Sequence, residues 1–580
     1  MPVGALAFLA VGGYVAPGLC ASCHAEIART YSQTGMGRSV NPVLSVPPAE
    51  PFYHAASDRH YELVERSGKW GMRRYQPGPE GAQANVVERS IDYVVGSGNH
   101  ARTYLHQTED GTLRELPLSW YAERGGYWAM SPGYDRPDHD DFRRRVGEQC
   151  LFCHAAYPTA RDAPPAAIDC QRCHGPGLQH VEKAQAPAAR EEIRSAIVNP
   201  ARLSPRRRIE VCLQCHLETT SRPLPDAIRR FDRQPLSYQV GEPLAGYVVH
   251  FDHPAASGRG DKFEVNHAGY RFLQSKCYGE SEGALDCTSC HDPHRALRGP
   301  EAAEHYRQAC RSCHSAPIAA SHPAGEDCIA CHMPKRRAED AVHVVMTDHR
   351  IVRTLPGRDL LAPLDELAMA KRAAYTGEVV LHAPADGLDD DTARLYLALA
   401  QIKDVANLRP GVPRLAQAVA DLEPPQAEFY FELGAAHMKM GALPEAAQAY
   451  REAIRRQGSW GTPYVRLAEV LLRAGKPGEA IAVLKDSPEP VEGEAAMTLG
   501  VALGQLGRLD DSMQALERAV RTMPDHPMAW LNLGVSLEQK KDFRRAESCY
   551  REAIRVRPDF EPARRHLANL LAAVGEGDVR

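Results

Sequence analysis

Seven copies of the pentapeptide Cys-x-x-Cys-His lie in the first 332 residues of this 580-residue chain. With 16 Cys and 25 His in the whole sequence, chance would produce roughly 0.02 such copies. In haem c attachment, the two thiols bond to the porphyrin and the following histidine binds the iron. The pattern therefore predicts seven covalent haem c groups. The predicted attachment residues are Cys20, Cys23 and His24; Cys150, Cys153 and His154; Cys170, Cys173 and His174; Cys212, Cys215 and His216; Cys287, Cys290 and His291; Cys310, Cys313 and His314; and Cys328, Cys331 and His332.

Structural zinc sites and disulfide scaffolds also use paired cysteines. Zinc sites draw four ligands from two half-sites, which gives no reason for a histidine directly after every second cysteine. A disulfide scaffold is disfavoured because fourteen of the sixteen cysteines already belong to the motifs. Only Cys277 and Cys549 lie outside them. We expect Cys277 to be a buried, inert thiol, with a ligand or redox role as the alternative.

The length predicts two to four domains, and the charge excludes one class of partner. The formal net charge of -5 becomes roughly -12 if each oxidised haem adds about one negative charge through its propionates. No basic excess points to a nucleic acid as partner. No segment approaches the roughly 18 apolar residues of a membrane span.

Covalent haem attachment implies export to an oxidising compartment. The stretch 3–16 is apolar enough for the core of a secretion signal but has no basic residues before it. We therefore interpret residues 1–16 as the remnant of a signal peptide whose start lies upstream. The expected location is the periplasm or the extracellular space.

The composition divides the chain into a motif-bearing part and a repeat part. Residues 17–355 are predicted to form a seven-haem cytochrome c domain of short helices and long loops, because about fifty residues per haem leave little polypeptide core. Residues 52–130 contain no motif and read as short strands, so we expect a small antiparallel β insert that carries His54, His60, His100 and His106. Residues 356–390 are assigned as a connecting segment, and the overall fold class is mainly α.

A 34-residue period dominates residues 391–580. Leu-Gly or Leu-Ala pairs recur at Leu433, Leu467, Leu499, Leu533 and Leu567. Glycines recur at one turn position and alanines at one packing position. This period and the small-residue pattern are similar to tetratricopeptide repeats, which are helix pairs stacked into a superhelix. The segment 391–424 follows the register weakly, and residues 560–574 are expected to form a lone capping helix.

Seven haems need up to seven further axial ligands, and fourteen histidines of this part lie outside the motifs. His180 and His294 follow their own motifs so closely that neither easily reaches the far face of its own porphyrin. We therefore expect each to bind the iron of a neighbouring haem. The other candidate ligands are His349, His100, His267, His322 and His343, with Met36 as an alternative thioether ligand that is more simply read as a packed side chain.

Three stretches of the motif-bearing part resemble a known superfamily. They are Cys170-x-x-Cys-His-Gly-Pro-Gly-x-x-His180, Cys287-x-x-Cys-His-Asp-Pro-His294, and Cys328-x-x-Cys-His-Met-Pro with Thr-Asp-His349 downstream. This part is similar to the superfamily of pentahaem nitrite reductase, hydroxylamine oxidoreductase and their tetrahaem electron-transfer relatives. The whole chain resembles multihaem cytochromes with tetratricopeptide repeats. The resemblance implies packed haem pairs, largely bis-histidine ligation and export, although the Cys-x-x-Cys-Lys of the nitrite reductases is absent.

The leading functional hypothesis is an electron-transfer protein whose repeats dock a redox partner protein or another copy of the chain. The alternative is a multihaem oxidoreductase that acts on a small nitrogen or sulfur oxyanion at one haem with an open site. His54, His60, Arg102 or Tyr104 would then serve as acid or base. A third reading treats the haems as structural supports for the repeats. We also expect the repeat array to be separable, so that a chain ending near residue 385 keeps its haems.

Overall fold

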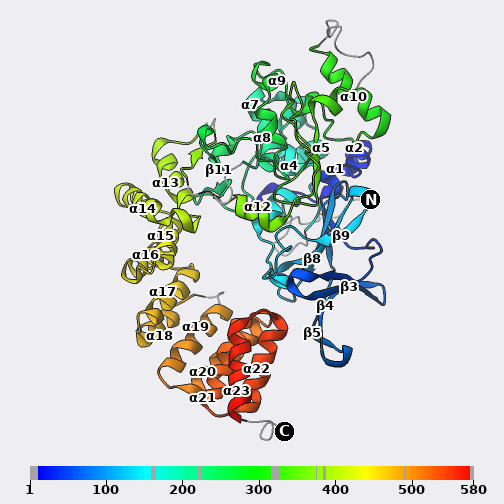
Figure 1. Cartoon of the computed structure of the whole chain (residues 1–580). Helices are drawn as coiled ribbons and strands as arrows, with labels where there is room; N and C mark the ends of the chain where they lie inside the picture. The colour runs from blue at the N-terminus through cyan, green and yellow to red at the C-terminus, as the bar shows by residue number, and fades with distance from the viewer. Residues whose placement is uncertain are drawn as a thin grey trace.

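The computed structural model describes residues 11–158, 165–219, 224–314, 327–373, 375, 377–382, 387–488 and 492–574. Figure 1 shows the N-terminal part with its strands and short helices, and the helical array that leaves it and curves back beneath it. The fold is mainly helical, with helical repeats at the C-terminus and a substantial amount of β-sheet in the N-terminal region. Among the described residues, no helix is long and apolar enough to cross a membrane.

Two antiparallel sheets form most of the region between the first and second motifs. The five-stranded sheet has the order β1 (Val40–Pro42), β6 (Tyr93–Val95), β7 (Ala101–Gln107), β8 (Leu113–Tyr121) and β9 (Tyr127–Met130). The four-stranded sheet contains β2 (Phe52–His54), β3 (Arg59–Arg66), β4 (Lys69–Pro77) and β5 (Gln83–Ser90). The hairpin of β3 and β4 turns at Ser67 and Gly68, which have φ of 53° and 77°.

The two sheets share one apolar core, so the expectation of a small insert in a mainly α domain is corrected here. Tyr61 and Met72 from the four-stranded sheet pack in one cluster with Leu116, Leu118 and Met130 from the other. The strands begin at residue 40, before the predicted start at 52. The physical reason is that a stretch without attachment motifs must bury its own side chains, and packed sheets achieve this.

The motif-bearing remainder consists of short helices joined by long loops, as expected. These helices are α1 (Pro17–Cys23), α2 (Ala25–Tyr31), α3 (Glu148–His154), α4 (Gln171–His174), α5 (Leu178–Gln185), α6 (Arg190–Ser195), α7 (Pro205–His216), α8 (Ala268–Leu273), α9 (Lys276–Gly279), α10 (Gly299–Arg311) and α11 (Cys328–His332). Strands β10 (Ala227–Arg229), β11 (Val248–Asp252) and β14 (Val380–Leu381) form a small sheet, and β12 (Lys335–Arg337) pairs with β13 (Val345–Thr347).

The first residues described belong to this fold. Val15 is 2% exposed. Its backbone N–H donates to Gln171 Oε1 at 2.9 Å, and its carbonyl accepts from Gln171 Nε2 at 2.7 Å. The Tyr14 ring lies 4.5 Å from that of Tyr157. Of the predicted signal remnant, residues 1–10 lie outside the described residues, but removal of all sixteen would cost these buried contacts.

The C-terminal array consists of antiparallel helix pairs. After α12 (Glu366–Ala373) the helices are α13 (Asp390–Gln401), α14 (Leu408–Leu422), α15 (Ala427–Lys439), α16 (Leu443–Arg456), α17 (Thr462–Arg473), α18 (Pro477–Lys485), α19 (Glu492–Gln505), α20 (Leu509–Thr522), α21 (Pro527–Gln539), α22 (Phe543–Val556) and α23 (Glu561–Val574). Gly441, Gly475 and Gly507 all have positive φ at the turn inside a pair. In α21, a Cβ at Gly534 would lie 2.4 Å from Tyr550, so the helices of this pair approach more closely than alanine permits.

The start of the array shares a core with the N-terminal part. Val249 and Phe251 of β11 belong to the same cluster as Leu395 and Leu399 of α13. In addition, β14 pairs with β11, with Phe251 opposite Leu381. The segment 356–390 therefore contributes a strand to a sheet of the N-terminal part, and the two parts are joined by packing as well as by the chain.

Candidate functional site

Each attachment motif is wound as one helical turn or a close approximation to it. The histidine N–H donates to the carbonyl of the first cysteine at 2.9 Å for His24, His174 and His291, and at 3.0 Å for His314. Helices α3, α7 and α11 end at His154, His216 and His332. Since residues three apart lie on one helix face, this winding places the two thiols of a motif side by side. None of the sixteen cysteines is paired in a disulfide.

Three motif histidines face a second imidazole from elsewhere in the chain. The ring centroids of His24 and His180 are 6.4 Å apart, with 18° between the ring planes. His174 and His294 are 6.0 Å apart at 12°. His291 and His349 are 6.2 Å apart at 41°. His180 and His294 thus lie opposite imidazoles of motifs other than the ones they follow.

Backbone carbonyls orient several of these rings. The Nδ1 atoms of His174 and His180 lie 2.9 and 2.8 Å from the carbonyls of Val198 and Ile193. His349 Nδ1 lies 3.0 Å from the Thr347 carbonyl. His332 Nδ1 lies 2.7 Å from the Val352 carbonyl. A proton held on Nδ1 by such a bond leaves the Nε2 lone pair free to bind a metal.

Burial favours the neutral form of these imidazoles. It lowers the pKa of His174 and of His349, and it lowers the pKa of His291 to about 4. A neutral imidazole is the form that donates to a metal. Within the residues described, no cluster of three or more His, Cys, Asp or Glu side chains is arranged to hold an ion. A porphyrin iron binds only one or two ligands from the protein, so a pair of opposed imidazoles would be enough to ligate it.

Cysteines of different attachment motifs contact one another. The Cys20 thiol hydrogen-bonds to Cys170, and the Cys153 thiol to Cys215; these bonds lower the pKa of Cys170 and of Cys215 to about 7 each. Similar contacts join Cys212 to Cys287 and Cys310 to Cys328. The thiol contacts therefore link the first motif to the third, the second to the fourth, the fourth to the fifth, and the sixth to the seventh.

The remaining candidate ligands contact other residues or lie outside the described residues. His100 is exposed, and its side chain hydrogen-bonds to the backbone of Val345. His267 is fully buried, with Nε2 3.2 Å from Glu264 Oε2. His343 Nδ1 lies 3.4 Å from Tyr127 Oη. His322 falls outside the described residues. For His267, His322 and His343 the ligand role stays a prediction.

The candidate acid and base groups occupy separate positions on the two sheets. His54 Nε2 lies 3.1 Å from Asp135. The His60 ring stacks against Tyr53 and Tyr75. Tyr104 is 1% exposed, and burial raises its pKa to about 12. The Arg102 guanidinium lies over Trp120. Met36 begins a single helical turn, Met36–Arg38, and Cys277 lies in α9.

The sequence did not predict one buried residue among the motifs. Arg172, inside the third motif, is 2% exposed. Its guanidinium lies over the rings of Phe152 and Tyr157 at 4.4 and 4.2 Å, and its Nη2 is 3.8 Å from Cys215 Sγ. It therefore contacts the second, third and fourth motifs. Its position between two attachment cysteines was visible in the sequence, but nothing there indicated burial.

Comparison with known proteins identifies the C-terminal part. The tetratricopeptide repeat model matches residues 407–459, 465–527 and 497–559. Together with the paired helices, this shows that the array consists of tetratricopeptide repeats. The protein O-mannosyl-transferase TMTC1 of Mus musculus is 25% identical over 183 residues, 32% of this chain and 16% of that protein. The Homo sapiens TMTC1 is 23% identical over 212 residues, 37% and 21% respectively. The chain thus spans only a minor part of these relatives.

Solved structures of repeat proteins are similar to the same part. YrrB, described as a TPR protein with an unusual peptide-binding site, is 22% identical and covers 30% of this chain and 91% of its own, with a TM-score of 0.26. MamA from Desulfovibrio magneticus is 17% identical, covers 30% and 99%, and has a TM-score of 0.28. A thermophilic TPR protein from Thermus thermophilus is 19% identical, covers 31% and 99%, and has a TM-score of 0.27.

Proposed function

We propose that this protein is a multihaem c-type cytochrome, exported to the periplasm or beyond, that carries electrons through seven covalent haem c groups. The observation that carries the proposal is the set of three opposed imidazole pairs, each containing a motif histidine. The three pairs have similar ring-centroid separations, between 6.0 and 6.4 Å.

The residues fit the group in spacing and in chemistry. Two metal–nitrogen bonds of about 2 Å, plus roughly 1 Å from each nitrogen to its ring centre, place two axial imidazole centroids about 6 Å apart. The centroid separations of 6.4, 6.0 and 6.2 Å agree with this value. The helical winding presents both thiols of each motif on one side, as two thioether bonds to one porphyrin require.

Bound haem supplies an iron that takes up and releases single electrons. The chain's own residues provide the rest. Carbonyl bonds to Nδ1 hold His180 and His349 in one tautomer, and burial keeps His174 and His291 neutral. Attachment cysteines of different motifs lie close to one another, which supports electron passage from one site to the next.

The repeat array is proposed to dock a redox partner protein or a second copy of the chain. Tetratricopeptide repeats commonly mediate protein–protein interaction, because stacked helix pairs expose an extended concave face. This assignment and the haem assignment are independent, since the family match covers only the repeats.

Haem counting tests the proposal. Pyridine haemochrome quantitation against protein mass, with intact-mass spectrometry, should give seven haems per chain, because each motif supplies two thiols and a histidine. The variant Cys277→Ser should keep seven, whereas Cys150→Ser with Cys153→Ser should give six. A count of five or fewer in the unaltered protein would contradict the proposal.

A further inference from the structure

Among the described residues, the array contacts the N-terminal part at two places that differ in chemistry. The first contact, at β11, β14 and α13, is apolar and continuous with the chain. The second lies at the far end of the array, where α22 approaches β5 (Figure 1). Here the contacts are charged and polar. The array therefore closes back onto the part that it leaves.

Four arginines of the N-terminal part make this second contact, which we name the clasp. Arg59 Nη2 donates to Asp559 Oδ1 at 2.6 Å, and Arg89 pairs with Asp525. Arg74 Nη2 donates to the Arg555 carbonyl at 3.0 Å. Arg143 Nη1 donates to the Val556 carbonyl at 3.3 Å. Helix α22 thus ends on two guanidinium groups, which satisfy carbonyls that a helix end leaves without a partner. The clasp comprises Arg59, Arg74, Arg89, Arg143, Asp525, Asp559 and the carbonyls of Arg555 and Val556.

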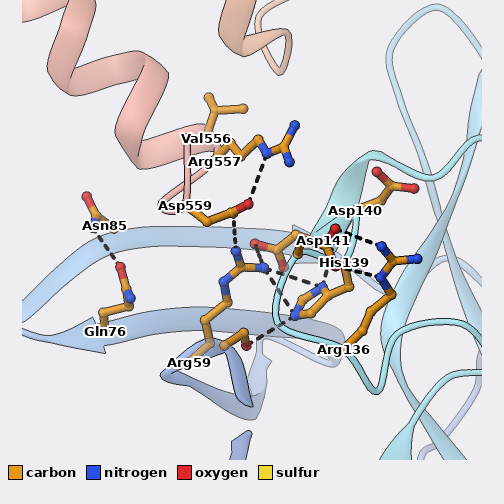
Figure 2. Close-up of polar contacts among 12 residues, drawn as sticks. Arg59, Gln76, Asn85, Arg136, His139, Asp140, Asp141, Val556, Arg557 and Asp559 are labelled. Atoms are coloured by element: carbon orange, nitrogen blue, oxygen red, sulfur yellow. Dashed lines mark hydrogen bonds and ion pairs between the residues drawn. The ribbon is translucent and has the colours of Figure 1, made fainter. Parts of the chain in front are cut away.

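Asp141 connects the arginines of the clasp behind the interface. It is 1% exposed, and its Oδ2 lies 2.7 Å from Arg74 Nε and 3.7 Å from Arg59 Nη1. Figure 2 shows Asp559 reaching Arg59 from the array side, with His139 and Asp141 on the other side of that guanidinium. Asp141 has φ of 55°, a strained backbone conformation for this residue. The two arginines hold it there.

The strained turn leads directly into the second attachment motif. After Asp141, the segment pairs with β8: Glu115 N–H donates to the Arg144 carbonyl, and Val146 N–H to the Leu113 carbonyl, both at 2.9 Å. Gly147 then starts α3, in which Leu151 packs with Leu113. A movement of the turn at Asp141 is thereby passed along a short, bonded segment to α3.

We propose that the clasp couples the repeat array to the Cys150–His154 attachment motif, so that a protein bound along the array changes the environment of that one site. The inference rests on the proposed function, because it takes the motif to carry a haem. The strained turn at Asp141 is the element that responds, since Arg59 and Arg74 hold it and also bind the array.

The test removes the two acidic partners on the array. The double variant Asp525→Asn with Asp559→Asn keeps the buried Asp141 pairs, and both altered side chains are partly exposed, so the fold should persist. Asp421→Asn with Asp510→Asn is the matched control, because it removes two array charges that pair with Arg394 and Lys540 away from the clasp. Small-angle scattering of the full chain, at low and high salt, reports whether the array is closed. Electron paramagnetic resonance with redox titration reports each haem.

We expect the clasp variant to have a larger maximum dimension than the control and to shift the signal of one haem among seven. That signal should be the one that His154→Met alters. Array opening with all seven signals unchanged would overturn the coupling, as would an unchanged dimension at both salt concentrations. A haem count of five or fewer in the unaltered protein would instead contradict the proposed function, while the scattering comparison would still decide whether the clasp holds the array.

Discussion

Single histidines carry most of the chemistry proposed here. His180 faces His24, although it follows the third motif in sequence, and His294 faces His174, although it follows the fifth. The helical turn of its own segment positions each motif histidine. Its opposed imidazole comes from elsewhere in the chain, so each pair depends on the packing of two segments.

Removal of one opposed imidazole should free one axial position. We expect His180→Ala to keep seven haems and to convert the haem attached at Cys20 and Cys23 to a high-spin form, because His24 then lacks its facing ring. Electron paramagnetic resonance of the oxidised protein measures this change. His106→Ala is the control, since His106 pairs with Asp92 on the β-sheet. An unchanged low-spin spectrum in His180→Ala would show that His180 is not a ligand.

Buried neutral histidines should make the fold sensitive to acid. Burial lowers the pKa of His139 to about 3, and that of His250 to about 3. The unfolded chain takes up these protons near pH 6.5, whereas the folded chain does so only near pH 3. Stability therefore falls as the pH drops through this window, by up to about 1.4 kcal/mol per pH unit for each group.

The variant His139→Gln should weaken that dependence. Glutamine offers an acceptor for the Asp141 N–H, which donates to His139 Nδ1 at 3.1 Å, without a proton to bind. Denaturant unfolding between pH 6.5 and 4 should show a slope smaller by roughly 1 kcal/mol per pH unit. An identical slope in both proteins would mean that His139 is charged in the folded state.

At the scale of elements, the repeats follow their sequence closely. Gly441, Gly475 and Gly507 take positive φ at the turn between paired helices. Lys541 occupies the equivalent turn of the next pair, with φ of 65°. A side chain in this conformation costs about 1 kcal/mol, which the three glycines avoid.

Lys541→Gly should therefore stabilise the array by roughly 0.5–1 kcal/mol. Thermal and denaturant unfolding of the full chain measure the change. Lys540→Gly is the comparison, because Lys540 has φ of -80° and pairs with Asp510, so glycine there should destabilise. Equal effects of the two substitutions would contradict the strain at Lys541.

At the scale of the whole molecule, the array is attached at both ends. The structure revises the expectation of a separable array, because Leu224, Ile228, Val249 and Phe251 belong to the same core cluster as array residues. Four such side chains, at about 1.5–3 kcal/mol each, represent roughly 6–12 kcal/mol of burial. This is comparable to the stability of an entire domain.

A chain that ends near residue 385 should therefore express as insoluble or haem-poor protein. A chain that ends near residue 424 retains α13 and α14, which cover the shared cluster, and should stay soluble with its haems. Soluble yield and haem content per chain compare the two. Full haem loading in the shorter chain would show that the shared cluster is dispensable.

Local patterns determined what could be read from the sequence alone. Each attachment motif occupies five consecutive residues, and the repeats show a regular period in the sequence. Neither pattern depends on contacts between distant segments, so both can be recognised from the sequence. The tertiary structure decided the rest. It set the extent of the two sheets, the partners of His180 and His294, the burial of Arg172 and the clasp at Asp559. Each of these joins segments far apart in the chain, and the geometry of such a contact is set by packing and charge, which no single stretch of sequence contains.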